Sequence, residues 1–110
     1  MKQYVVDELR PGDFEKIKAY LDENHARSGV ENLYWIELEG EILTKVQAAH
    51  TRCQPFCFAV EVMPERLGCE LLVRTKNRMR CSCMQYANEK QRNWLIGLVD
   101  SMIDEIGLKV

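Results

Sequence analysis

Cysteine and histidine are the residues of this chain best suited to metal or thiol chemistry. His50, Cys53 and Cys57 lie close together in sequence, and Cys81 and Cys83 follow further along. Thiolate and imidazole suit zinc, which takes four ligands in tetrahedral geometry. Structural zinc sites commonly carry Cys-x-x-Cys pairs on tight turns, whereas Cys81 and Cys83 are expected on a strand, with Cys57 on the opposite face. No metal ligand set is therefore assigned, and zinc held by His50, Cys53 and Cys57 is the alternative hypothesis.

The same cysteines have a second interpretation as free thiols. The chain has five cysteines, an odd number, and buried free cysteine is a common small core residue. A disulfide between Cys69 and Cys83 is conceivable if they face each other on neighbouring strands, but it would be strained. Cys53, beside Arg52 and near His50, is the candidate for a reactive thiolate, because nearby positive charge stabilises the charged form. The simpler expectation is that the cysteines on strands are core residues.

Other catalytic groups are scarce. Histidine occurs only at positions 25 and 50, and His25 is expected at the end of a helix, where a cation interacts favourably with the helix dipole. A nucleophile also needs a positioned base and an orienting partner, and no such arrangement stands out in the sequence. We therefore expect a protein without catalytic activity.

Basic residues gather toward the C-terminal end of the sequence. Residues 74–92 carry six bases against Glu89 alone, whereas residues 1–41 carry ten acids against five bases. Arginine binds carboxylate and phosphate through paired hydrogen bonds, and a helix N-terminus attracts anions. The expected anion- or partner-binding residues are Arg74, Lys76, Arg78, Arg80, Lys90 and Arg92. The alternative is a self-paired surface, in which the arginines bridge Glu61 and Glu70 on the same outer face.

The partner expected for this basic surface is an acidic protein surface, including the acidic N-terminal part of a second copy. Trp35 is a candidate anchor for self-association, since tryptophan is enriched at interface hot spots. Nucleic acid has less support, because the chain has a net charge of −2 and single-strand binders normally add exposed aromatic residues to a basic sheet. The leading hypothesis is a small binding or interaction module that contacts an anionic partner or itself.

Three alternating segments are expected to position these side chains. Residues 56–62, 69–74 and 78–83 alternate apolar with polar residues, as strands with one face on a core do. The breaks between them predict hairpin connections, so residues 56–84 are expected to form an antiparallel three-strand meander. In the expected register Cys69 faces Cys83, which places the apolar side chains on one face. Arg74, Arg78 and Arg80 then share the other.

The remaining elements are two strands and three helices. Strands are expected over residues 3–9 and 33–38, and helices from Asp13 to within 24–29 and over 41–50. The clearest helix begins at Asn88, where Gln91 completes a capping box, and it ends at Gly107.

Together these elements predict a single two-layer α+β domain over residues 1–110, in the order β-α-β-α-β-β-β-α, with an antiparallel sheet packed under helices. The length of 110 residues suits one modest core. No apolar run is long enough to span a membrane and the start lacks an apolar signal segment, so a cytoplasmic location is expected.

Overall fold

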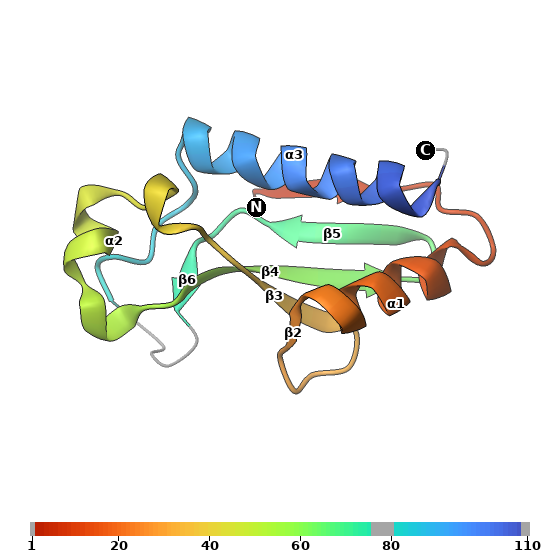
Figure 1. The fold of residues 1–110 in the computed structure, drawn as a ribbon, viewed down its shortest axis with the longest axis horizontal. Helices are drawn as coiled ribbons and strands as arrows, with labels where there is room; N and C mark the ends of the chain where they lie inside the picture. The colour runs from red at the N-terminus through yellow and green to blue at the C-terminus, as the bar shows by residue number, and fades with distance from the viewer. Residues whose placement is uncertain (1, 76–80, 109–110) are drawn as a thin grey trace.

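An antiparallel sheet with helices on one of its faces forms the described part of the chain, residues 2–75 and 81–108 of a computed structural model (Figure 1). The strands are β1 (Gln3–Val6), β2 (Ala26–Arg27), β3 (Leu33–Glu37), β4 (Phe56–Met63), β5 (Arg66–Glu70) and β6 (Arg74–Thr75). The helices are α1 (Asp13–Asn24), α2 (Lys45–Ala49) and α3 (Glu89–Ile106), with two short 3-10 helices, η1 (Gly40–Ile42) and η2 (Thr51–Cys53). The predicted α+β class is confirmed, and the order matches apart from the short strand β2.

β4 is the central strand of the sheet, with strands paired to both of its edges. Its alternating sequence buries the side chains of one face. Phe56, Phe58, Val60 and Val62 are at most 1% exposed and belong to the core under α1 and α3. Phe58 also stacks on Trp94 of α3, with 6.3 Å between the ring centroids. Each fully buried side chain of this kind contributes about 1.5–3 kcal/mol. The core side of the alternation predicted over 56–62 is therefore confirmed, although Cys57 on the other side of the strand is buried as well.

β5 and β6 lie one after the other along the same edge of β4, with an interruption between them. β3 pairs with one edge of β4, and β5 and β6 pair with the other. Val60 faces Cys69 and Phe56 faces Thr75, so a step of four residues along β4 (60 to 56) corresponds to a step of six residues along its neighbour (69 to 75). The two additional residues interrupt the ladder between Glu70 and Arg74, as in a bulge.

The predicted pairing of β5 with a third meander strand is wrong. Cys69, expected to face Cys83, faces Tyr4 of β1 instead. The reason is that β1 occupies the free edge of β5, so the sheet has the order β1-β5-β4-β3-β2. A returning strand can therefore meet the chain only beyond Glu70.

The chain does return there, but in a different register. Leu72 faces Tyr86, and the N–H of Val73 donates to the carbonyl of Gln85 at 2.9 Å. The predicted register would have paired Leu72 with Arg80, which lies outside the described residues. Because pairing resumes so late, Cys81 and Cys83 lie in a turn rather than on a strand.

The termini of the long helices follow local sequence signals. The capping box predicted at Asn88 and Gln91 is confirmed, and Gly107 closes α3 with φ 87°. Asp13, the first residue of α1, accepts a hydrogen bond from the backbone N–H of Arg10 at 2.9 Å. Gly12 is the N-cap, with φ 95°, a conformation that glycine adopts readily.

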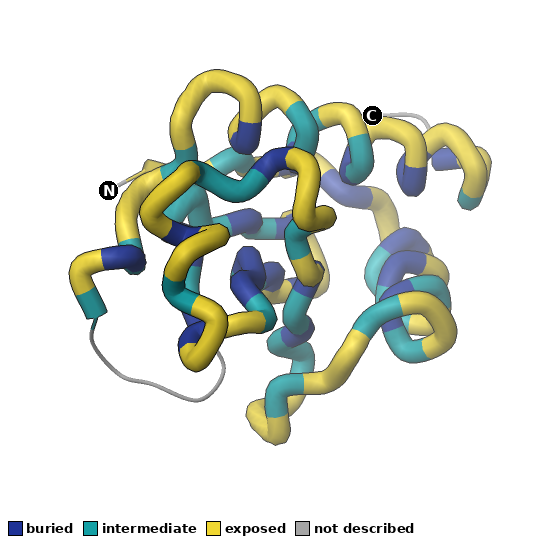
Figure 2. Tube along the Cα trace, turned by 60° about the vertical axis from the view of Figure 1, so that its left-hand side comes forward, coloured by how far each residue is buried: buried dark blue, intermediate teal, exposed yellow. Residues whose placement is uncertain are grey.

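One end of the molecule is built from short elements, and we call it the α2 lobe (residues 40–54 and 81–87). The single helix expected over 41–50 is divided into η1 and α2. Seen end-on, this part of the chain is mostly exposed or half-buried, with isolated buried positions (Figure 2). The molecule measures 43 × 27 × 25 Å, and the α2 lobe lies beyond the sheet at the left of Figure 1.

Candidate metal centre

Four potential metal ligands converge in the α2 lobe. The imidazole of His50 and the thiols of Cys53, Cys81 and Cys83 offer one ligand atom each, and these atoms all lie within 4.8 Å of one another. His50 Nδ1 lies 3.2 Å from Cys81 Sγ. In a tetrahedral zinc site with Zn–S bonds of about 2.3 Å, neighbouring ligand atoms are about 3.8 Å apart. The cluster therefore has nearly the dimensions of a Cys3His site.

A 3-10 turn brings His50 and Cys53 together. His50 follows the last residue of α2, and the backbone N–H of Cys53 donates to the His50 carbonyl at 3.0 Å. With three residues per turn, side chains three positions apart project from the same side of a 3-10 helix. His-x-x-Cys thus presents two ligands together here.

A second tight turn brings Cys81 and Cys83 to the same place. The backbone N–H of Met84 donates to the carbonyl of Cys81 at 3.0 Å, closing a turn around Ser82. The backbone N–H of Cys83 in turn donates to the thiol of Cys81. The late return of the chain toward Tyr86 frees this turn from the sheet, which is why both sulfurs can face His50.

The cluster is closed on one side and open on the other. Cys53 and Cys83 are 4% and 1% exposed, whereas His50 and Cys81 are half-buried. A cavity of about 430 Å³ reaches the open side, and its lining consists of Ala49, His50, Thr51, Arg52, Cys53 and Cys81. Small solutes can therefore approach His50 and Cys81.

The two thiols of the second turn differ in acidity. The backbone N–H and then the thiol of Cys83 stabilise the thiolate of Cys81 and lower its pKa from 9.0 to about 6. Burial is the main cause that raises the pKa of Cys83 to about 12. In the absence of a metal, Cys81 thus carries the negative charge near neutral pH and Cys83 keeps its proton. A divalent cation would favour the loss of both protons.

Two buried glutamines support the cluster from behind. Gln47 donates from Nε2 to the carbonyl of Cys83 at 3.4 Å, and Gln91 donates from Nε2 to Gln47 Oε1 at 2.8 Å. Gln91 also donates to the carbonyl of Ile42 at 3.0 Å. Both glutamines are 1% exposed, and each completes a capping box, Gln47 with Thr44 and Gln91 with Asn88. The first turn of α3 is thereby linked to the turn that carries Cys83.

The sequence analysis missed this supporting role, although it identified the capping box at Asn88. Thr44 and Gln47 have the same spacing as Asn88 and Gln91, which is the signal that could have revealed the N-terminus of α2. The contact between the two glutamines joins positions 44 residues apart and has no local signature.

The other cysteines lie elsewhere. Cys57, named with His50 and Cys53 in the zinc hypothesis, lies on β4 between Glu37 of β3 and Arg74 of β6 and is not part of the cluster. Cys69 is buried in the core, and burial raises the pKa of its thiol to about 12. The structure thus retains two of the three named ligands and adds Cys81 and Cys83 to them.

The predicted basic surface is described only in part. Arg74 pairs with Glu70 on the outer face of the sheet, at 2.5 Å from Nε to Oε1, as the self-paired alternative requires. Lys90 donates to the carbonyl of Glu41 at 3.3 Å, and Arg92 is exposed. The remaining members, Lys76, Arg78 and Arg80, lie outside the described residues. Trp35, the predicted anchor, is half-buried on β3.

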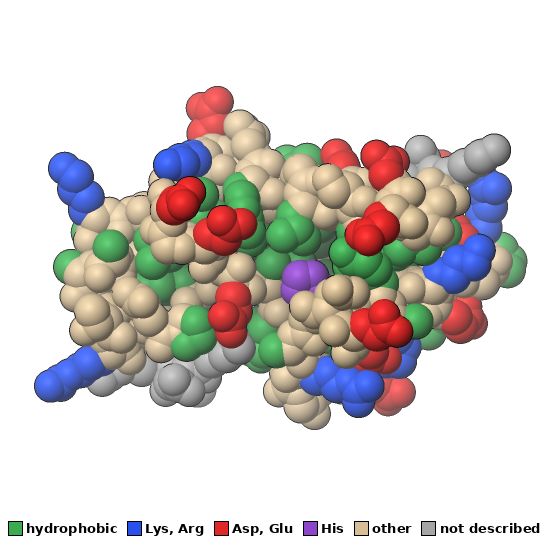
Figure 3. Space-filling model, viewed as in Figure 1, with side chains coloured by type: hydrophobic (Ala, Val, Ile, Leu, Met, Phe, Trp, Pro, Cys, Tyr) green, Lys and Arg blue, Asp and Glu red, His purple; other side chains and the backbone are tan. Residues whose placement is uncertain are grey.

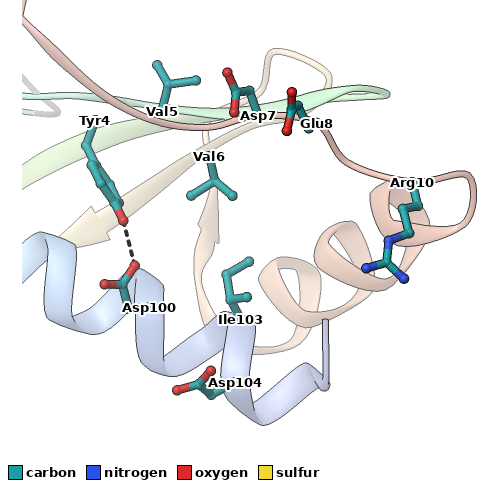
Figure 4. Close-up of a pocket in the computed structure, with 9 residues that line it drawn as sticks. All are labelled: Tyr4, Val5, Val6, Asp7, Glu8, Arg10, Asp100, Ile103 and Asp104. Atoms are coloured by element: carbon teal, nitrogen blue, oxygen red, sulfur yellow. Dashed lines mark hydrogen bonds between the residues drawn. The ribbon is translucent and has the colours of Figure 1, made fainter. Parts of the chain in front are cut away.

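A second cavity, away from the cluster, has an acidic lining. It measures about 680 Å³ and lies between β1 and the end of α3, where Tyr4 donates to Asp100 at 2.6 Å (Figure 4). Asp7, Glu8 and Asp104 also line it, together with Arg10. Acidic side chains are also scattered over α1 and α3 on the face shown in Figure 3. This cavity contains neither histidine nor cysteine.

Comparisons with known proteins give no match that informs this site. No family model matches the chain, and neither a curated protein nor a solved structure matches it. Within the described residues, no helix is both long and apolar enough to cross a membrane.

Proposed function

We propose that this protein is a zinc-binding domain in which His50, Cys53, Cys81 and Cys83 hold one Zn²⁺. The observation that carries the proposal is the convergence of their four ligand atoms within 4.8 Å. Three sulfurs and one imidazole nitrogen suit zinc, and four protein ligands complete its usual tetrahedral shell. Oxygen-preferring cations such as Mg²⁺ and Ca²⁺ fit this set poorly.

The role of the ion in this proposal is structural. A catalytic zinc site keeps a position open for water or substrate, whereas a full set of four protein ligands leaves none. Gln47, which holds the carbonyl of Cys83, supplies the outer support that oriented metal ligands commonly have. The ion would hold the η2 turn against the turn at Cys81, and its binding free energy would stabilise the α2 lobe.

Contact with an anionic partner through the basic residues remains a separate prediction. Its support is the excess of bases over residues 74–92. The two proposals are connected by position, because Arg80 directly precedes Cys81 and Thr75 directly precedes Lys76.

Elemental analysis of protein purified without chelator tests the zinc proposal. We expect about one zinc per chain and, after exchange with Co²⁺, the strong visible absorption of tetrahedral cobalt thiolates. Replacing both Cys81 and Cys83 with serine should abolish the binding. The matched control also loses two cysteines, through Cys57→Ser and Cys69→Ala, and should retain the metal. Equal metal contents in the two double variants would refute the assignment.

A further inference from the structure

We propose that Cys81 is a modification site for hydroperoxides and that Cys53 is the thiol that resolves the oxidised product. The inference rests on the proposed zinc centre, because it describes what happens to that centre when an oxidant arrives. Its basis is the geometry of the cluster: two cysteines line one cavity, the half-buried Cys81 and the more deeply buried Cys53, with their sulfurs within disulfide-forming reach after a small movement.

Access selects Cys81 as the sulfur that is attacked first. Cys53 and Cys81 both line the cavity of about 430 Å³, but Cys53 is only 4% exposed whereas Cys81 is half-buried. Cys83 is 1% exposed and is not part of the lining. Arg52 and Thr51 line the same cavity. Their side chains provide hydrogen-bond donors for a peroxide oxygen, and the guanidinium charge favours the hydroxide that leaves.

The chemistry proceeds in two balanced steps. The thiolate of Cys81 attacks one oxygen of the hydroperoxide, the O–O bond breaks, and hydroxide or alkoxide leaves, so that sulfur is oxidised to sulfenic acid and the peroxide is reduced. The thiolate of Cys53 then attacks the sulfur of this sulfenic acid, the S–S bond forms as the S–O bond breaks, and the departing hydroxide takes up one proton from solvent and leaves as water. The disulfide no longer supplies two thiolate ligands, and Zn²⁺ leaves a site reduced to His50 and Cys83.

The position of Cys53 makes it the resolving partner. Its sulfur lies within 4.8 Å of Cys81 and comes from a separate segment, so a bridge between them closes no small ring. Cys81 and Cys83 flank a single residue, and a bridge between them would strain the turn. The hydrogen bond from Gln47 to the carbonyl of Cys83 also holds that residue in place.

The test uses the zinc-loaded wild-type protein and hydrogen peroxide. Zinc content is measured first, so that a protein without zinc refutes the proposed function before any oxidant is added. With zinc present, we expect release of about one zinc per chain to a chromogenic chelator. Peptide mapping should show one new disulfide, between Cys53 and Cys81. Addition of a thiol reductant and zinc should restore the original metal content.

Two variants sharpen the assignment. In the Cys53→Ser protein the sulfenic acid of Cys81 has no resolving partner. When this variant is first reduced and then treated with peroxide, a dimedone adduct should accumulate at Cys81, whether or not the variant retains zinc. The Cys57→Ser/Cys69→Ala protein should behave as the wild type. A Cys81–Cys83 disulfide would overturn the role of Cys53. Retention of zinc at peroxide concentrations that oxidise free cysteine would overturn the whole inference.

Discussion

The sheet with α1 and α3, and the α2 lobe, are stabilised in different ways. Beneath the long helices, the core side of β4 is fully buried, and apolar contact supplies the stability. The α2 lobe has helices of three to five residues, and its most buried side chains include the polar Gln47, which bonds to the buried Gln91 of α3. Helices this short are unstable without outside support. Regions that cannot build an apolar core commonly depend on a metal or a disulfide, and this is the role proposed for zinc here.

The largest effect is expected from a change in the sheet. Phe58→Ala removes a fully buried ring that stacks on Trp94, and such changes cost about 3–5 kcal/mol. Urea unfolding followed by far-UV circular dichroism measures the loss. If the two regions are independent, the loss should be the same with zinc and with a chelator. A loss that depends on zinc would show that the two regions unfold as one unit.

The next largest effect is expected behind the cluster. Gln47→Ala removes the side chain that supports the carbonyl of Cys83, and loss of such outer support typically weakens metal binding about 10–100-fold. Competition with a chromogenic zinc chelator measures the affinity. Gln54→Ala is the matched control, because Gln54 is an exposed glutamine of the same lobe whose side chain donates to the carbonyl of Ala48. Equal affinities in the two variants would remove the glutamine pair from the site.

The third effect is the pH dependence of thiol reactivity in metal-free protein. The pKa of Cys81 is lowered to about 6, so its reactive thiolate predominates above that value and decreases about tenfold per pH unit below it. Alkylation by iodoacetamide, followed residue by residue with mass spectrometry, should therefore label Cys81 already at pH 7. Cys69, whose pKa burial raises to about 12, should remain unlabelled until the protein unfolds. Labelling of both at the same pH would contradict this contrast.

The smallest effect is expected on the outer face of the sheet. Arg74→Ala breaks a partly exposed ion pair with Glu70, and such pairs contribute about 0–1 kcal/mol. Thermal unfolding at low and high salt measures the change. If Arg74 instead binds an anionic partner, the variant should weaken association with an acidic polymer more than it changes stability. The Arg66→Ala protein is a control, since Arg66 is an exposed arginine on β5.

Local sequence signals predicted β4 and the long helix α3, because the pattern of each is formed by residues close together in sequence. The alternation of β4 and the capping box of α3 needed only a few adjacent residues. The third meander strand failed because β1, distant in sequence, pairs with β5 and excludes it. Since the two cysteines after residue 80 were assigned to that strand, the sequence analysis separated them from His50 and Cys53.

Two of the four residues of the cluster, His50 and Cys53, were predicted from sequence because they depend on a local spacing. His50 and Cys53 share one 3-10 turn, so their proximity follows from a spacing of three. Cys57 lies about as close to Cys53 in sequence as His50 does, but it already belongs to β4. The extended backbone of that strand directs Cys57 away from the cluster. The arrival of the second pair depends on where the chain returns beside Leu72, which alternation alone cannot specify.

The separation of the two ligand pairs along the chain also has a consequence for the order of folding. Cys53 lies before β4 in the chain and Cys81 lies after β6, so the entire β4–β5–β6 unit lies between the two halves of the site. Bringing the halves together in an unfolded chain would require closure of a long loop, with its entropic cost. Once the strands have paired, the two halves of the site are already close, and this entropy has already been lost. Zinc should therefore bind tightly only late in folding, and its uptake would report that this part of the sheet is complete.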